Sequence, residues 1–234
     1  MDITSEIFQV GGNEFSAPED AAVYLVAIND RGVLVDAGCG GSVEKILNNI
    51  RGCGIDPADI DLLLLTHCHY DHSGGAAAIK TACDCKILVH EADAEFLAAG
   101  DDRATAANWY DAEMAPLEVD TRIQGRHHTI DFRGHVIHAL HCPGHTPGSV
   151  VYWLDSDGLR VVFAQDVHGP LNSAFRSNAL DYQASLKRLL ALEADVLCEG
   201  HFGVFRGKQS AARFIPVSYT HLTLPTTCTP CRSR

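Results

Sequence analysis

The stretch that decides the fold runs from Leu62 to Gly75 and reads LLLLTHCHYDHSGG. Its four leucines are too short a run for a helix of their own and predict a buried strand. Three histidines and an aspartate follow within the next seven residues, and small residues then open an alanine-rich helix. The pattern predicts a strand that delivers metal ligands at its carboxyl end.

The spacing within this stretch suits two metal ions. His67 and His69 are two residues apart, so in an extended chain they project to the same side. The turn into the following helix can bring Asp71 and His72 toward a second position nearby. A polar loop in a chain with 13 histidines is the alternative. We favour the ligand interpretation, because a cluster of imidazoles beside a carboxylate is energetically unfavourable without a cation.

This segment resembles the signature of the metallo-β-lactamase-fold hydrolases, and the resemblance extends from about residue 5 to 214. It implies three further ligands, which the chain supplies in the expected order: His145 in CPGHTPGS, Asp166 in FAQD and His201 in CEGHFG. It also implies an α/β fold, an αββα four-layer sandwich with the site at one edge of its two sheets.

The resemblance implies a division of the ligands between two divalent metal ions. One ion would be held by His67, His69 and His145, the second by Asp71, His72 and His201, with Asp166 between them. Zinc is the default for hydrolysis, although iron and manganese suit the same ligand types. A metal-bridged hydroxide would attack an ester, thioester, lactone or amide carbonyl of a small molecule, with Asp71 as the catalytic residue that orients it or accepts its proton. The glyoxalase II-like and lactonase-like branches stay unresolved, and a mononuclear iron persulfide dioxygenase on the same fold is the alternative.

Other residues have less specific signals. The resemblance implies that Asp36, in the VDAG that ends an apolar strand, supports a ligand imidazole from beneath the site; a turn aspartate before Gly38 is the alternative. His168 is expected either to polarise a substrate carbonyl or to lie in a solvated loop. Cys142 could line the site, and Arg176 and Lys208 are candidates for contacts with an anionic substrate or with water alone.

Composition indicates one globular domain without a membrane or nucleic-acid partner. The chain has 234 residues, of which 46% are hydrophobic and 21% charged, and a formal net charge of −12 that disfavours a phosphate backbone. No apolar run approaches the roughly 20 residues that span a bilayer. The amino-terminal residues lack the basic and hydrophobic regions of a secretory signal, which predicts a cytoplasmic location and nine reduced cysteines. The oligomeric state is left open.

The end of the chain changes character at Val217. Residues 217–234 contain no acidic residue and continue no helical or alternating pattern, and they resemble the translation of a transposon-end adaptor used in sequencing libraries. We therefore expect a hydrolase domain over residues 1–216, truncated at its carboxyl end, and a non-native read-through tail over 217–234.

Periodicity predicts strands that alternate with helices. Expected strands end at Asp36, His67 and Asp166, and a helix with Ser42 as its N-cap precedes the ligand strand. Residues 101–116 carry no clear pattern. Trp109 and Tyr110 in this region are expected to wall a substrate pocket, or Trp109 to pack into the core from an ordinary helix.

Overall fold

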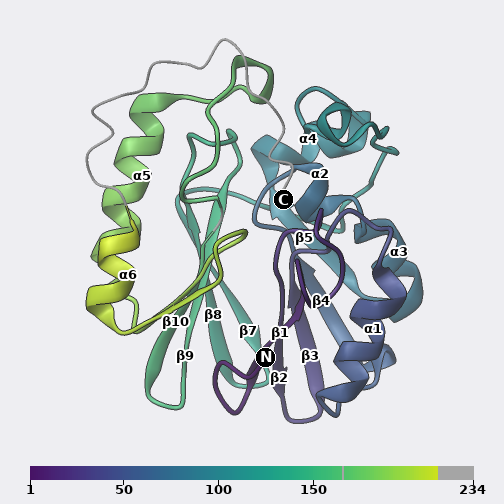
Figure 1. The fold of residues 1–234 in the computed structure, drawn as a ribbon, viewed down its shortest axis with the longest axis vertical. Helices are drawn as coiled ribbons and strands as arrows, with labels where there is room; N and C mark the ends of the chain where they lie inside the picture. The colour runs from purple at the N-terminus through teal and green to yellow at the C-terminus, as the bar shows by residue number, and fades with distance from the viewer. Residues whose placement is uncertain (165, 216–234) are drawn as a thin grey trace.

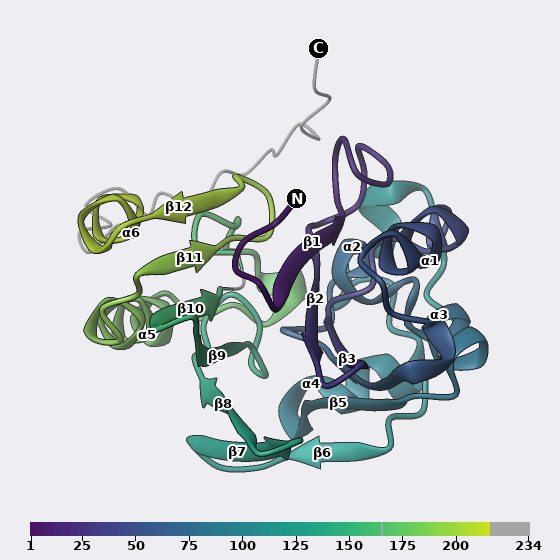
Figure 2. The ribbon, with the colours of Figure 1, turned by 90° about the horizontal axis from the view of Figure 1, so that it is seen from below.

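Two six-stranded sheets lie face to face, and each carries helices on its outer surface (Figures 1 and 2). The structure is a computed structural model that describes residues 1–164 and 166–215. The expected αββα sandwich is confirmed. The proposed tail over 217–234 lies outside the described residues.

The first sheet follows the order of the chain. Its strands are β1 (Ile7–Gly11), β2 (Val23–Ile28), β3 (Arg31–Val35), β4 (Ile60–Leu64), β5 (Lys86–His90) and β6 (Thr121–Ile123). The first three strands pair antiparallel, and β3 to β6 pair parallel. Its outer side carries α1 (Val43–Gly52), α3 (Ala76–Cys83) and α4 (Glu91–Ala99), while the short α2 (Tyr70–Ser73) follows β4.

The strands of the second sheet also follow the order of the chain. Its strands are β7 (His127–Phe132), β8 (His135–His141), β9 (Val150–Ser156), β10 (Leu159–Phe163), β11 (Val196–Cys198) and β12 (Val204–Arg206). All neighbours are antiparallel except β10 and β11, which are parallel. Helices α5 (Ala179–Ala191) and α6 (Lys208–Phe214) lie on its outer side, and three short 3-10 turns complete the described elements: η1 (Pro57–Asp59), η2 (Ala107–Tyr110) and η3 (Ser173–Phe175).

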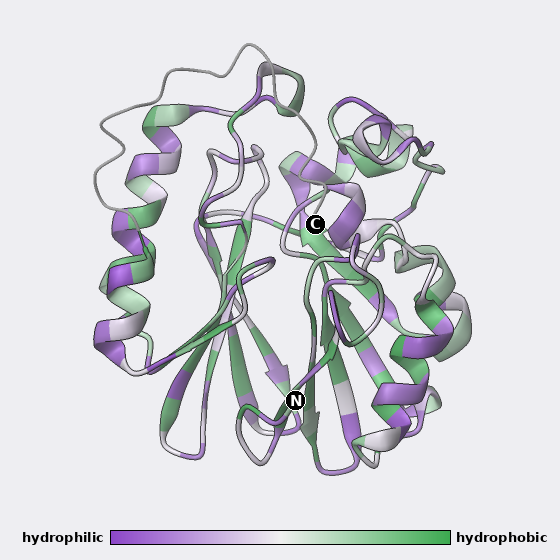
Figure 3. Cartoon of the chain, in the orientation of Figure 1, coloured by the Kyte–Doolittle hydropathy of each residue, from purple (hydrophilic) through white to green (hydrophobic). Residues whose placement is uncertain are grey.

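Three buried clusters fill the three spaces between the four layers. Strand β9 contributes side chains to two of these clusters. Tyr152 and Leu154 face the space between the sheets, whereas Val151 faces α5, because side chains alternate along a strand. In Figure 3 the strands are mainly green, for hydrophobic, while α1 and α5 alternate between green and purple. Each helix therefore buries one face and exposes the other.

Helix α1 forms on the predicted residues, but Ser42 does not cap it. Val43, Ile46, Leu47 and Ile50 are buried, as their spacing predicts. The Ser42 side chain makes no capping hydrogen bond, and its hydroxyl donates to the buried carboxylate of Asp20. Asp20 also accepts a hydrogen bond from the Cys39 amide. The Ser42 hydroxyl thus bonds a partner distant in sequence instead of capping the helix.

Two strands were absent from the sequence prediction, and one segment proved irregular. Strands β6 and β12 have three residues each, too few for a visible alternation. Between α4 and β6 the chain forms only the 3-10 turn η2, so Trp109 is not on an ordinary helix. Among the described residues, no helix combines the length and apolar character needed to cross a bilayer.

Candidate metal centre

The predicted ligand residues meet at one edge of the two sheets. Strands β3 and β4 are parallel, as are β10 and β11, so their carboxyl ends lie at common edges. The connections that leave β4, β8, β10 and β11 carry all seven predicted ligands. Their ligand atoms form two groups, each within 4.8 Å: His67, His69, His145 and Asp166 in one, and Asp71, His72 and His201 in the other.

Asp166 lies between the two groups. One carboxylate oxygen, Oδ2, is 3.3 Å from Nε2 of His145 in the first group. The other, Oδ1, is 3.0 Å from Nε2 of His72 and 3.2 Å from Nε2 of His201 in the second. A single carboxylate therefore reaches both clusters, as a bridging ligand would.

The first group fits a cation. Nε2 of His67 and of His69 are buried without a hydrogen-bond partner among the described residues, and Nδ1 of His69 lies 2.9 Å from Nε2 of His145. Burial, and then the neighbouring histidines, lower the pKa values of His67 and His69 well below the ordinary range. These imidazoles are therefore neutral, which is the form that binds a metal.

The second group is rich in negative charge. Burial opposes charge on every member, yet Asp166, Asp36 and Asp71 raise the pKa of His72 well above the ordinary value. Asp166 and Asp71 likewise raise the pKa of His201 against its burial. The pKa of Asp71 falls to about 2, because His72 and His201 outweigh its desolvation. The carboxylates are thus ionised at neutral pH and compensated by protons on the histidines.

Metal loading is therefore expected to release protons near pH 7. His72 and His201 hold protons in the metal-free protein because their pKa values are raised, and a histidine must be neutral to bind a metal. Apparent affinity should rise with pH over the range in which these groups lose their protons. Titration calorimetry in buffers of different ionisation enthalpy measures the release, and zinc binding without proton release would contradict this assignment.

Asp36 contacts the second group through His72, and its role as a support for a metal ligand stays a prediction. Its Oδ2 accepts a hydrogen bond from Nδ1 of His72 at 2.7 Å, which leaves Nε2 directed at the cluster. The same carboxylate accepts from the amide and the hydroxyl of Thr66, at 2.8 and 2.9 Å. Asp36 has φ of +65°, an uncommon conformation outside glycine, held here by these contacts.

A sequence model of the metallo-beta-lactamase superfamily matches residues 17–201, which include every residue of the two groups. The chain belongs to this superfamily.

Relatives in the superfamily include hydrolases of several kinds. A probable metallo-hydrolase of Methanocaldococcus jannaschii is 27% identical over 54% of this chain, and the match covers 59% of that protein. Acyl-coenzyme A thioesterase MBLAC2 of Gallus gallus is 26% identical over 86% of this chain and 79% of its own length. The class B3 di-zinc metallo-beta-lactamase LRA-12, from an Alaskan soil metagenome, is 27% identical with a TM-score of 0.73, covering 86% of this chain and 77% of that one.

Asp93, which sequence reasoning missed, joins two of the three loops that carry the first group. This fully buried residue of α4 accepts hydrogen bonds from the amide of Cys68 at 3.0 Å, the hydroxyl of Thr146 at 2.7 Å and the amide of Gly148 at 2.7 Å. A Cβ atom at Gly148 would lie only 2.6 Å from atoms of Asp93, so the close approach requires glycine. The loop with the sequence GHTPG is therefore held in place by the Asp93 carboxylate.

Glu199, which sequence reasoning also missed, joins two further loops of the centre through its carboxylate. Its side chain is fully buried and accepts from the amides of Val167 at 3.0 Å, His201 at 2.7 Å and Phe202 at 2.8 Å. The carboxylate thereby ties the residue after Asp166 to the loop that carries His201. The only signal in the sequence was its position two residues before His201.

An aromatic wall borders the centre. The ring of Phe175 lies 4.4 Å from the ring of His69 and 4.8 Å from that of Trp109, measured between centroids. Tyr110 packs against Tyr70 and interacts with the Asp71 carboxylate. Burial raises the Tyr110 pKa, and the charge of Asp71 and a hydrogen bond to it raise the pKa further, so this hydroxyl stays protonated as a donor.

His168 is not brought into either group. Its side chain is exposed, and Nε2 lies 2.8 Å from the carbonyl oxygen of Phe214 in α6, a contact in which the imidazole donates. Its ring also packs on those of Phe202 and Phe214. In this structure it connects the loop after β10 to α6, and a role toward substrate stays a prediction.

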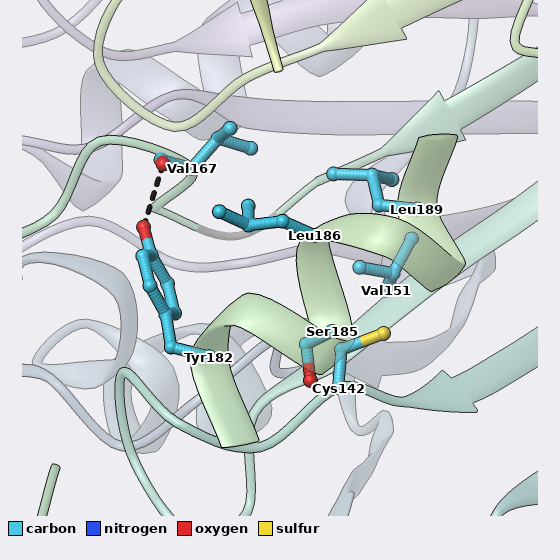
Figure 4. Close-up of a pocket in the computed structure, with 7 residues that line it drawn as sticks. All are labelled: Cys142, Val151, Val167, Tyr182, Ser185, Leu186 and Leu189. Atoms are coloured by element: carbon cyan, nitrogen blue, oxygen red, sulfur yellow. Dashed lines mark hydrogen bonds between the residues drawn. The ribbon is translucent and has the colours of Figure 1, made fainter. Parts of the chain in front are cut away.

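Cys142 lies beneath α5 rather than against the metal centre. It lines a void of about 10 Å³, close to the smallest volume that holds one water molecule (Figure 4). The other lining residues are Val151, Val167, Tyr182, Ser185, Leu186 and Leu189. The Tyr182 hydroxyl lies 2.6 Å from the carbonyl oxygen of Val167 and 2.9 Å from that of Asp166. It therefore holds the loop with Asp166 from the side of α5.

Proposed function

We propose that this protein is a dinuclear metal-dependent hydrolase of a small molecule with an ester, thioester, lactone or amide carbonyl. One observation carries the proposal: two groups of buried ligand atoms share the single carboxylate of Asp166. The di-zinc enzyme of 27% identity supports two zinc ions over one. The thioesterase among the relatives makes a thioester the first substrate to test.

The two sites differ in their donors. His67, His69 and His145 would hold one ion, and Asp71, His72 and His201 the other, with Asp166 shared. When bound, the ions would lower the pKa of water and polarise the substrate carbonyl. Zinc is the default for hydrolysis, although iron and manganese suit the same imidazole and carboxylate donors.

Asp71 is the residue we assign to proton handling. Its carboxylate is buried and, with a pKa of about 2, is ionised at neutral pH. It lies 3.2 Å from Nε2 of His201, the one member of the two groups with an exposed side chain. Asp71 is therefore next to the most exposed of the candidate ligands, where it can orient a water molecule and accept its proton.

The proposal is tested by a hydrolysis screen of acyl thioesters, lactones, aryl esters and β-lactams with zinc-loaded protein. We expect turnover of at least one class, loss of turnover after chelation and recovery on adding zinc or manganese. A protein that binds one iron per chain and consumes oxygen would contradict the proposal in favour of a sulfur dioxygenase.

Tyr110 is expected to bind substrate as a hydrogen-bond donor. The pKa of its hydroxyl is raised by burial and by the charge of Asp71, so the hydroxyl stays protonated and can donate to a carbonyl oxygen as negative charge develops there. Replacing Tyr110 with Phe should lower kcat by roughly tenfold to a hundredfold, less than loss of a full oxyanion donor, with metal content unchanged. A variant that alters only metal content would assign Tyr110 to the support of Asp71 instead.

A further inference from the structure

A second cavity, of about 260 Å³, lies beside the aromatic wall. It is lined by Asp101, Arg103, Ser173, Ala174 and Arg176, so it is formed by the loop that follows α4 and by the 3-10 turn η3. None of these residues belongs to the two ligand groups. The chemistry described so far leaves this cavity without a role.

The turn η3 connects the cavity to the metal centre. Phe175, between Ala174 and Arg176, is buried with its ring centroid 4.4 Å from that of His69 and 6.4 Å from that of His145. Its two neighbours in the chain line the cavity. The cavity and the metal centre are therefore neighbours across this turn, so one elongated substrate is able to contact both.

The charge of the cavity favours an anion. Neither Arg103 nor Arg176 has a carboxylate partner within ion-pair distance among the described residues, and Arg176 lies 5.7 Å over the ring of Phe96. Asp101 contributes one negative charge, but its Oδ1 accepts the amides of Arg103 and Ala104, each at 3.0 Å. Two arginines thus line the cavity together with one aspartate, whose Oδ1 already accepts two backbone amides.

Guanidinium groups suit one chemistry in particular. Their planar donors match the oxygen pairs of phosphate and carboxylate, and they lose less hydration than an ammonium group on binding them. The rest of the chain disfavours anions, with a formal net charge of −12. An anionic substrate would therefore be attracted to this cavity rather than to the surface in general.

We infer that the cavity between the loop after α4 and η3 binds a phosphate or carboxylate group of the substrate, remote from the carbonyl that reacts. This inference rests on the proposed hydrolase function and deepens it. It predicts that preferred substrates are anionic esters or thioesters, with Arg103 and Arg176 determining that preference.

The test compares three thioesters of equal length that end in a carboxylate, a phosphate or a neutral amide. Each is assayed with the zinc-loaded wild-type protein, Arg103→Gln, Arg176→Gln and the double variant. Arg126→Gln is the matched control, because this exposed arginine lies outside the cavity and changes charge equally. We expect each cavity variant to raise KM about tenfold for the anionic thioesters, with kcat and the kinetics of the amide unchanged. The preferred group is the one with the lower wild-type KM.

Equal wild-type kcat/KM for all three thioesters, or equal losses for charged and neutral thioesters in the variants, would overturn the inference while leaving the proposed function intact. Hydrolysis of none would contradict the proposed function, and calorimetry with hexyl phosphate then decides the inference. Binding at least tenfold weaker to the double variant than to wild type and Arg126→Gln would support it. Equal binding to all three proteins would overturn it.

Discussion

Replacing Asp71 with Asn should lower kcat by about a thousandfold, within the range of roughly 10² to 10⁴ for loss of a general base. The amide nearly preserves the shape of the side chain but cannot accept a proton from water. The pKa of about 2 keeps wild-type Asp71 ionised over the whole neutral range, so its carboxylate can accept a hydrogen bond from water and orient it. The reaction rate with the best substrate from the screen, together with metal content by mass spectrometry, measures the effect.

Two comparisons make this result specific. Asp84→Asn is the matched control, because Asp84 is exposed at the end of α3 in a left-handed conformation that asparagine also tolerates. Its kcat should equal that of wild type. Asp71→Asn with near-normal kcat would contradict the proton-handling role. A loss explained entirely by a lost metal ion would reduce Asp71 to a ligand.

Glu199→Gln should destabilise the fold by about 2 kcal/mol and weaken metal binding by about 10- to 100-fold. The buried carboxylate accepts three backbone amides, from Val167, His201 and Phe202. Glutamine has one acceptor oxygen, and its NH₂ group would face an N–H donor inside the protein. The loop with Asp166 and the loop with His201 would then lose their common partner.

Urea unfolding of the metal-free protein and competition with a zinc indicator separate the two effects. Glu118→Gln serves as the control, because Glu118 is exposed and should show neither. Wild-type zinc affinity in Glu199→Gln would contradict the view that this carboxylate positions the ligands. Wild-type stability would show that the buried amides find other partners.

The convergence of the seven candidate ligands could be predicted because its signal is local or ordered along the chain. His67, His69, Asp71 and His72 fall within six residues after a leucine run, and the structure places them where strand and turn geometry require. The fold class followed from strands that alternate with helices. Strands β6 and β12 could not be predicted, because three residues show no periodicity.

The missed residues have roles that depend on distant partners. Asp93 bonds residues 25, 53 and 55 positions away, and Glu199 bonds Val167 at a separation of 32. The residues next to Asp93 and Glu199 in the sequence give no signal of those contacts. The expected Ser42 cap failed for the same reason, since Asp20, 22 positions away, takes its hydroxyl.

The central claim is that two cations share Asp166, and metal counting after zinc reconstitution tests it most directly. Mass spectrometry of the dialysed wild-type protein should find two zinc ions per chain. His145→Ala should retain one of them, since it removes a donor from the first group only. Wild-type protein that retains no metal after exposure to zinc, iron and manganese in turn would contradict the account.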